Sequence, residues 1–172
     1  CGCDETLKRM NRKYTAKEYK TVVESLRQKI SGVNITTDVI VGFPGETQEE
    51  FNETYDFLKD IELSKMHVFK YSPRKGTKAA GIKEQVDGNI KEERSHKLIT
   101  LNNILEKKFN NKFIGKNMNV LYELKSENNA YGFEGYTNNY IKVMVKSKQN
   151  IECEFHITKL MELEDDHIIG EV

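Results

Sequence analysis

The sequence predicts a protein of the α/β plus all-β class, with an α/β segment at residues 1–114 and a small β-barrel at residues 115–172. Two observations support this prediction. A strand–helix–strand pattern occupies residues 35–71, and after Gly115 the apolar residues change from helical spacing to alternation. The first pattern is typical of parallel sheets, and the second is typical of small antiparallel barrels.

The first helix is expected at residues 15–30. Thr15 and Glu18 form the capping-box pattern that begins many helices. The apolar residues that follow recur at helical spacing and form one stripe: Ala16, Tyr19, Val22, Val23, Leu26 and Ile30. Ser31 and Gly32 then stop the helix.

The next three elements form a predicted βαβ unit. Residues 35–41 are mostly β-branched and apolar, and we interpret them as a strand that is buried on both faces. A turn at residues 42–45 leads to a second capping box, Thr47 with Glu50, and a helix. Residues 66–71 form the second strand. Such a unit joins parallel strands through a right-handed connection.

A loop at residues 72–86 precedes a long helix, expected at residues 87–111 and ended by Gly115. The helix residues expected to face the core are Ile90, Leu98, Leu101, Leu105 and Phe109.

Alternating apolar residues predict the strands of the barrel. The inward-facing residues are expected to be Met118, Val120, Tyr122 and Leu124, then Ile141, Val143 and Val145, and finally Ile151, Cys153, Phe155 and Ile157. Cys153 is therefore interpreted as a buried small apolar residue. Turns are expected at residues 126–129 and 147–150.

The composition excludes several classes of protein. Hydrophobic residues make up 37% and charged residues 31% of the chain, which suits a globular protein with a core. No run approaches the ~20 apolar residues of a membrane span, and no signal peptide is evident. We therefore expect a cytoplasmic protein with no membrane partner. The cysteines suggest no disulfide framework and the histidines show no ligand spacing, so no metal site is expected.

Three segments resemble the methylthiotransferase family of radical S-adenosylmethionine enzymes. They are GCDETLKRMNRKYT at residues 2–15, TTDVIVGFPGET at residues 36–47 and HVFKYSPRKGT at residues 67–77. Residues 112–172 look like the family's terminal TRAM domain. The resemblance implies an incomplete radical-SAM (β/α) barrel at residues 1–114, followed by an OB-like TRAM barrel.

Three branches of this family modify different substrates. Cys3 and the GYTNNYIKV segment at residues 135–143 favour the branch that adds a methylthio group to carbon 2 of N6-threonylcarbamoyladenosine, next to the tRNA anticodon. The alternatives are the isopentenyladenosine branch, the ribosomal-protein branch, and an RNA-binding module without catalysis. The implied partner is the anticodon stem–loop of tRNA.

The family's cofactors are S-adenosylmethionine and two 4Fe–4S clusters. A Cys-x₃-Cys-x₂-Cys loop holds one cluster, and the resemblance implies that cleavage of the bound cofactor there yields a 5′-deoxyadenosyl radical. The sequence lacks this loop. We therefore expect a fragment that binds no cluster and is inactive without the missing N-terminal half of the same protein.

The resemblance also implies a set of cofactor-binding residues. They are Gly2, Cys3, Asp4, Asp38, Ile40, Gly42, Phe43, Phe69 and Tyr71. Gly42 ends a parallel strand, where α/β barrels place their sites, although a tight turn explains it equally well. Asp38 interrupts an apolar strand, and such a carboxylate either faces a ligand or is satisfied by backbone groups. Phe69 and Tyr71 flank the adenine or fill the core.

Candidate RNA contacts lie in three places along the chain. They are Arg9, Arg12 and Lys13; Arg74 and Lys75; and Tyr131, Tyr136, Asn138, Tyr140 and Lys142. Cations suit phosphates, and aromatic residues among amides suit unpaired bases. Solvated charges and barrel-core aromatics are the alternative interpretations.

Overall fold

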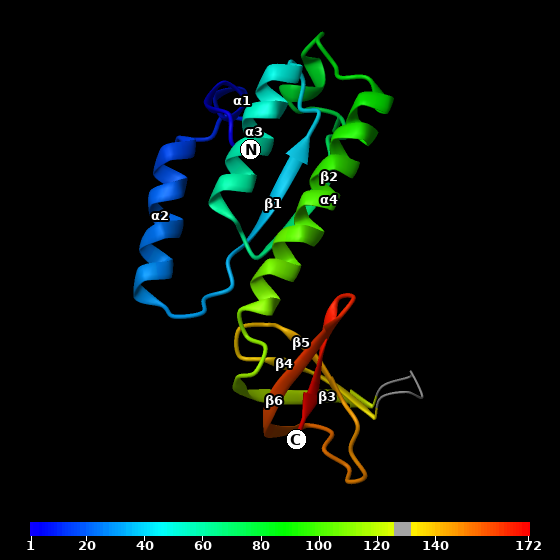
Figure 1. Cartoon of the computed structure of the whole chain (residues 1–172). Coiled ribbons are helices and arrows are strands. Elements are labelled where there is room, and N and C mark those ends of the chain that lie inside the picture. The colour runs from blue at the N-terminus through cyan, green and yellow to red at the C-terminus, as the bar shows by residue number, and fades with distance from the viewer. Residues whose placement is uncertain (126–131) are drawn as a thin grey trace. The chain divides into compact units, whose positions relative to one another are not determined.

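The computed structural model describes residues 1–125 and 132–172, which form two compact units, Cys1–Leu105 and Glu106–Val172 (Figure 1). The boundary falls within the long helix α4 (Gly88–Asn111). In the part of the chain that the structure describes, no helix is long and apolar enough to cross a membrane.

The first unit contains the predicted helices and the βαβ unit. Its elements before α4 are α1 (Asp4–Arg9), α2 (Ala16–Lys29), β1 (Thr36–Val41), α3 (Gln48–Ile61), β2 (Lys65–Lys70) and the 3₁₀ turn η1 (Ala79–Gly81). Both predicted capping boxes are present, at Thr15 with Glu18 and at Thr47 with Glu50. Strands β1 and β2 pair in parallel, with Thr36 opposite Lys65. The βαβ prediction is therefore confirmed in element order and strand direction.

The sheet of the first unit is buried on one face, not on both as expected. Val39 and Val41 lie in a core formed with α2, α3 and α4, whereas Asp38 is exposed. Successive side chains of a strand point to opposite faces, and helices cover only one of them here. The expectation that this strand is buried on both faces, with Asp38 inside it, is consequently wrong.

Helix α4 contributes Leu98, Leu101 and Leu105 to the first core, as expected. Ile90 is exposed instead of buried. One turn further along the helix, the buried position is occupied by Arg94, a charged residue that no apolar pattern identifies.

The second unit is a closed five-stranded barrel. Its strands are β3 (Asn117–Lys125), β4 (Phe133–Thr137), β5 (Lys142–Val145), β6 (Glu154–Glu164) and β7 (His167–Glu171), in the order β3-β4-β5-β7-β6. The predicted barrel is confirmed, with one correction: β5 and β7 pair in parallel, so the barrel is not wholly antiparallel. Val120, Tyr122, Ile141, Val143 and Val145 lie in its core as expected.

The predicted inward face of residues 151–157 is wrong after Ile151. Ile151 is buried, but Phe155 and Ile157 are 66% and 65% exposed, and Cys153 is exposed as well. Cys153 has a φ of +61°, and its N–H donates to Tyr122 O at 2.7 Å. This left-handed residue interrupts the alternation just before β6 begins. Thr158 and Leu160 then point inward instead.

Tyr122 predicts how the stability of the barrel depends on pH. Its side chain is fully buried, its hydroxyl lies 2.8 Å from Thr158 Oγ1, and burial raises its pKa from 10.0 to about 12. The folded state therefore holds the phenolic proton to higher pH than the unfolded state. Its contribution to stability is complete below pH 10 and decreases by about 2–3 kcal/mol as the pH rises to about 12.

We expect Tyr122→Phe to cost about 1 kcal/mol at pH 7, because one buried hydrogen bond is lost. Calorimetric unfolding of the wild type and the variant from pH 8 to 11.5 measures the difference. The free energy of unfolding of the wild type should exceed that of the variant at pH 8, and this difference should shrink and then reverse above pH 10. If both proteins lost stability equally as the pH rises, the raised pKa of Tyr122 would not be the cause of the pH dependence.

Candidate functional site

A cavity of about 480 Å³ lies beside the uncovered face of β1 and β2 in the first unit. Asp38 and Ile40 of β1, Phe69 of β2, and Tyr71 directly after β2 line it. Ile40 and Phe69 are direct partners in the strand register. The alternation that buries Val39 and Val41 thus places four of the predicted cofactor-binding residues together on the opposite face.

Other segments of the first unit also line the cavity, among them Leu7 of α1. Arg12 and Tyr14 come from the connection between α1 and α2, and Arg74 and Thr77 come from the loop after β2. Arg12 and Arg74 were predicted as RNA contacts, and the structure brings both to the cavity that holds the predicted cofactor residues. Lys13 and Lys75, next to them in sequence, are exposed and do not line it. Tyr14 and Thr77 were not predicted.

Tyr71 gives the cavity an unsatisfied polar group. Its hydroxyl oxygen is buried without a hydrogen-bond partner, although its N–H donates to Val41 O at 2.9 Å. Phe43 packs edge-on against the Tyr71 ring, with 5.3 Å between centroids, and Lys91 Nζ lies 5.6 Å from the ring centroid. A buried hydroxyl without a hydrogen-bond partner is costly, and a polar group of a bound ligand could supply that partner.

Gly42 serves the turn after β1 and does not line the cavity. Its φ of +68° favours glycine, and an added Cβ would lie 2.4 Å from Lys91 Cγ. Its N–H donates to Glu46 Oε2 at 2.7 Å. Both features agree with the turn interpretation of Gly42, which was the alternative to cofactor contact. Phe43 does not line the cavity either, and it packs against Tyr71, which does.

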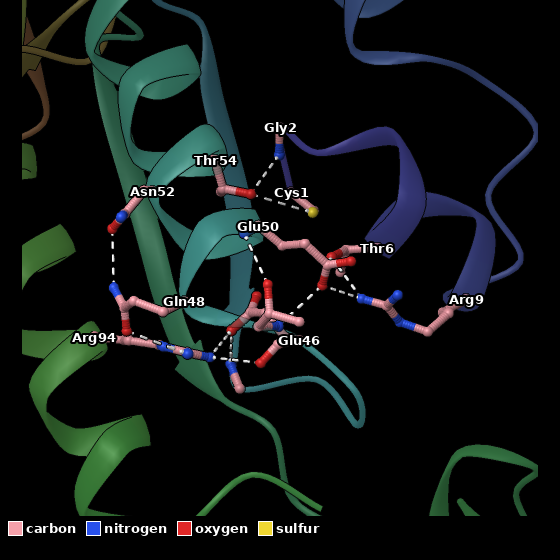
Figure 2. Close-up of polar contacts among 12 residues, drawn as sticks. Cys1, Gly2, Thr6, Arg9, Glu46, Gln48, Glu50, Asn52, Thr54 and Arg94 are labelled. Carbon is pink, nitrogen blue, oxygen red and sulfur yellow. Dashed lines mark hydrogen bonds and ion pairs between the residues drawn. The ribbon is translucent and has the colours of Figure 1, made fainter. Parts of the chain in front are cut away.

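The same turn rests on a buried ion pair that the sequence did not reveal. Arg94 Nη1 donates to Glu46 Oε2 at 2.7 Å and to Glu46 O at 3.1 Å, and both side chains are at most 5% exposed (Figure 2). Burial raises the pKa of Glu46, although the Gly42 N–H and Arg94 act in the opposite direction. The pair is separated by 48 residues, which is why no local spacing signals it.

Four residues at and just before α1 that were predicted to bind ligands make contacts within the protein. The Gly2 N–H donates to Thr54 Oγ1 at 3.2 Å, Cys3 is buried, and Asp4 Oδ1 accepts from the Ala16 N–H at 2.8 Å. Arg9 forms an ion pair with Glu50 of α3 (Figure 2). None of these four residues lines the cavity.

Glu50 joins α1 to the beginning of α3. It accepts hydrogen bonds from Arg9, from Thr6 Oγ1 at 3.2 Å and from the Thr47 N–H at 3.0 Å (Figure 2). Burial raises the pKa of Glu50, but these hydrogen bonds outweigh it and hold the pKa below its ordinary value. Arg9 is therefore engaged within the protein, and its guanidinium is less available for phosphate than that of Arg12.

The barrel carries the remaining predicted RNA contacts. Tyr140 is 80% exposed, its ring lies 6.4 Å from that of Tyr136, and Asn138 is exposed beside them. Lys142 Nζ pairs with Glu134 at 3.1 Å, which partly neutralises it. Tyr131 lies outside the described residues. The aromatic pair with a neighbouring amide is a suitable surface for unpaired bases.

No group of three or more His, Cys, Asp or Glu residues is arranged for metal binding within residues 1–125 and 132–172.

Comparison with known proteins adds an independent finding. Residues 2–58 match the Radical SAM superfamily model. A threonylcarbamoyladenosine tRNA methylthiotransferase of Bacillus subtilis is 43% identical over 152 residues, which cover 87% of this chain and 34% of that protein.

Two further relatives carry different names. A tRNA-2-methylthio-N(6)-dimethylallyladenosine synthase of Caldicellulosiruptor saccharolyticus is 38% identical over 99% of this chain and 36% of its own length. A ribosomal protein uS12 methylthiotransferase of Clostridium botulinum is 42% identical over 75% of this chain and 29% of its own length. The chain thus spans about a third of the length of the curated relatives it matches.

Proposed function

Because this chain belongs to the radical S-adenosylmethionine methylthiotransferase family, we propose that it is part of an enzyme that adds a methylthio group to carbon 2 of N6-threonylcarbamoyladenosine beside the tRNA anticodon. The observation that carries this proposal is the cavity of about 480 Å³, where Asp38, Ile40, Phe69 and Tyr71 meet. These four residues were all predicted to bind the cofactor, and they lie together in this cavity.

The residues of the cavity fit the proposed cofactor. Ile40 and Phe69 offer an apolar wall for an adenine ring, and the unpartnered Tyr71 hydroxyl offers a hydrogen bond. S-adenosylmethionine with the two 4Fe–4S clusters would supply the radical and sulfur chemistry, and the clusters would be held elsewhere in a longer protein. The part played by this chain is then to bind the adenosine end of a ligand, to orient it and to exclude water.

Two ion pairs hold elements that carry residues of the cavity, and they support this role. The Glu46–Arg94 pair holds the turn that ends β1, and the Arg9–Glu50 pair ties α1 to α3. Residues that position a substrate contribute to a rate through orientation, so a fixed turn beside the cavity is a suitable base for such a site.

The experiment that tests the proposal uses the longer protein with its clusters reconstituted. It is offered tRNA carrying N6-threonylcarbamoyladenosine, tRNA carrying N6-dimethylallyladenosine, and ribosomal protein uS12. Mass spectrometry of the nucleosides and the protein is expected to show a methylthio group on the threonylcarbamoyl nucleoside only. A product on either other substrate would assign the chain to the branch of the corresponding relative.

The barrel favours a second, compatible role in RNA binding. Tyr140 presents its ring at the surface beside Asn138, and stacking on one base contributes about 1–3 kcal/mol. We expect the 172-residue chain to bind an anticodon stem–loop weakly and with affinity that falls as salt is raised.

Tyr140→Ala is expected to weaken this binding about tenfold without changing its salt dependence, because stacking involves no phosphate. Tyr140→Phe keeps the ring and serves as the control. Fluorescence anisotropy at 50 and 200 mM salt measures both. If the wild-type chain binds no RNA at low salt, the barrel has no such role.

A further inference from the structure

The core-facing side of α4 begins with two basic residues, Lys91 and Arg94. The buried residues Ser95 and Leu98 follow Lys91 at positions i+4 and i+7, so they share one side of the helix with it. Arg94 has a carboxylate partner, Glu46. Lys91 is half-buried, and the residues that the structure describes place no carboxylate at ion-pair distance from its ammonium group. A lysine at such a position is uncommon without a partner, so its other contacts indicate its role.

The methylene chain of Lys91 lies against Gly42, in the turn after β1. A Cβ added to Gly42 would lie 2.4 Å from Lys91 Cγ, 3.1 Å from Cδ and 3.3 Å from Cε. Three successive carbons of the lysine therefore follow the surface of the glycine, and a larger residue at position 42 would displace them. The nearest atoms to a Cβ added at Gly45, in the same turn, belong to Arg9 instead.

The ammonium group of Lys91 reaches the aromatic ring of Tyr71, which lines the cavity. Its Nζ lies 5.6 Å from the ring centroid, within the distance of a cation–π contact. Phe43, from the same turn as Gly42, packs edge-on against this ring, with 5.3 Å between the centroids. The position of the ring therefore depends on α4 and on the turn after β1, whereas the Tyr71 hydroxyl oxygen is buried without a partner among the described residues.

We propose that Lys91 is a positioning residue for the cavity. Its methylene chain holds it against Gly42, and its ammonium group fixes the ring of Tyr71, so that the Tyr71 hydroxyl meets a polar group of the bound ligand. Lys91 does not line the cavity, so it acts through Tyr71 and does not touch the ligand. This inference rests on the proposed function, in which the ligand is the adenosine end of S-adenosylmethionine.

The test separates the charge of Lys91 from its packing. Lys91→Met keeps an unbranched chain against Gly42 but removes the cation. In the 172-residue chain without ligand, NMR is expected to show displaced signals of the Tyr71 ring in this variant, because the ring has lost its cation. Lys97→Met is the matched control, since it removes an exposed lysine of α4 that pairs with Glu93, and it should leave the Tyr71 signals unchanged.

Binding of S-adenosylmethionine to the same chain, measured by NMR titration, gives the functional readout. We expect Lys91→Met to raise the dissociation constant about three- to tenfold, which corresponds to the loss of one partly desolvated cation–π contact. The melting temperature should change little, because the packing on Gly42 is kept. Lys91→Arg keeps a cation and should recover most of the affinity, and Lys97→Met should retain all of it. A loss of affinity without a loss of stability distinguishes a positioning residue from one that only supports the fold.

A double-mutant cycle tests the contact with Gly42. Gly42→Ala should lower the melting temperature for two reasons, the left-handed φ of +68° and the clash with Lys91. In a Lys91→Ala background only the first reason remains, so the decrease should be smaller. Gly45→Ala is the control, because its φ of +78° is also left-handed but its added Cβ approaches Arg9. It should lower the melting temperature equally in both backgrounds.

Four results would overturn the inference. They are unchanged Tyr71 signals in Lys91→Met, equal affinity of the wild type and Lys91→Met, no detectable binding of S-adenosylmethionine by the wild-type chain at millimolar concentration, and an equal effect of Gly42→Ala in both backgrounds. Each leaves the proposed reaction open, because methylthio transfer by the longer protein is measured separately. Conversely, the expected loss of affinity in Lys91→Met without a methylthio product would refute the reaction and retain the positioning role.

Discussion

Replacing Arg94 by methionine is expected to lower the free energy of unfolding of the first unit by about 3–5 kcal/mol. The change leaves the Glu46 carboxylate, which is 2% exposed, without its cationic partner. Glu46 also accepts the Gly42 N–H, so it cannot turn to solvent without giving up the turn that ends β1. Since domains of this size are stable by only about 5–15 kcal/mol, much of the first unit should unfold at moderate urea concentrations.

Urea unfolding followed by amide NMR signals of Cys1–Leu105 measures this loss. The double variant Glu46→Gln with Arg94→Met removes the buried charge as well and should recover a large part of the stability. The single variant should also become more stable as the pH falls, because protonation neutralises Glu46, whose pKa burial raises. A loss below about 1 kcal/mol would mean that the pair does not support the turn.

Replacing Gly135 by alanine is expected to destabilise the barrel by about 1–3 kcal/mol or more. An added Cβ would lie 2.3 Å from Leu121 O and 2.8 Å from Tyr122 Cα, both backbone atoms of β3. Gly135 pairs with Tyr122 across the β3–β4 ladder, so the two strands must separate to admit a methyl group. No side-chain rearrangement can relieve a contact between a methyl group and backbone.

Thermal unfolding monitored on the signals of Glu106–Val172 tests this expectation. Gly132→Ala is the matched control, because its added Cβ would meet its nearest atom, Ser147 N, at 3.4 Å. The control should change the stability by less than about 1 kcal/mol. Equal melting temperatures for the two variants would show that β3 and β4 are not packed as described.

Local sequence rules predicted α2, α3, α4 and both strands of the first unit, but not α1 or η1. The capping boxes at Thr15 and Thr47 and the βαβ pattern depend on residues three or four apart or on a short period, and the structure contains all of them. Alternation also anticipated β3, β5 and the beginning of β6, but it did not identify β4 or β7. One left-handed residue, Cys153, defeated that rule, because it reverses which residues of β6 point inward.

The site was harder to predict, because it depends on residues far apart in sequence. Asp38, Ile40, Phe69 and Tyr71 were found through the resemblance, and the strand register explains why they lie together. The convergence of Arg12 and Arg74 follows from the approach of two connections to the same strands. The Glu46–Arg94 pair was missed because its partners are 48 residues apart, and no local sequence pattern marks an arginine that lies in the buried stripe of a helix.

The most direct test of the account is the nucleoside content of tRNA after deletion of the gene that encodes this chain. Liquid chromatography with mass spectrometry compares the deletion strain, the parent strain and a strain in which the gene is restored. We expect the deletion strain to lack the 2-methylthio derivative of N6-threonylcarbamoyladenosine and to accumulate N6-threonylcarbamoyladenosine without the methylthio group. Restoring the gene should restore the 2-methylthio derivative. An unchanged amount of that derivative, with loss of the dimethylallyl derivative or of the methylthio group on ribosomal protein uS12, would contradict it.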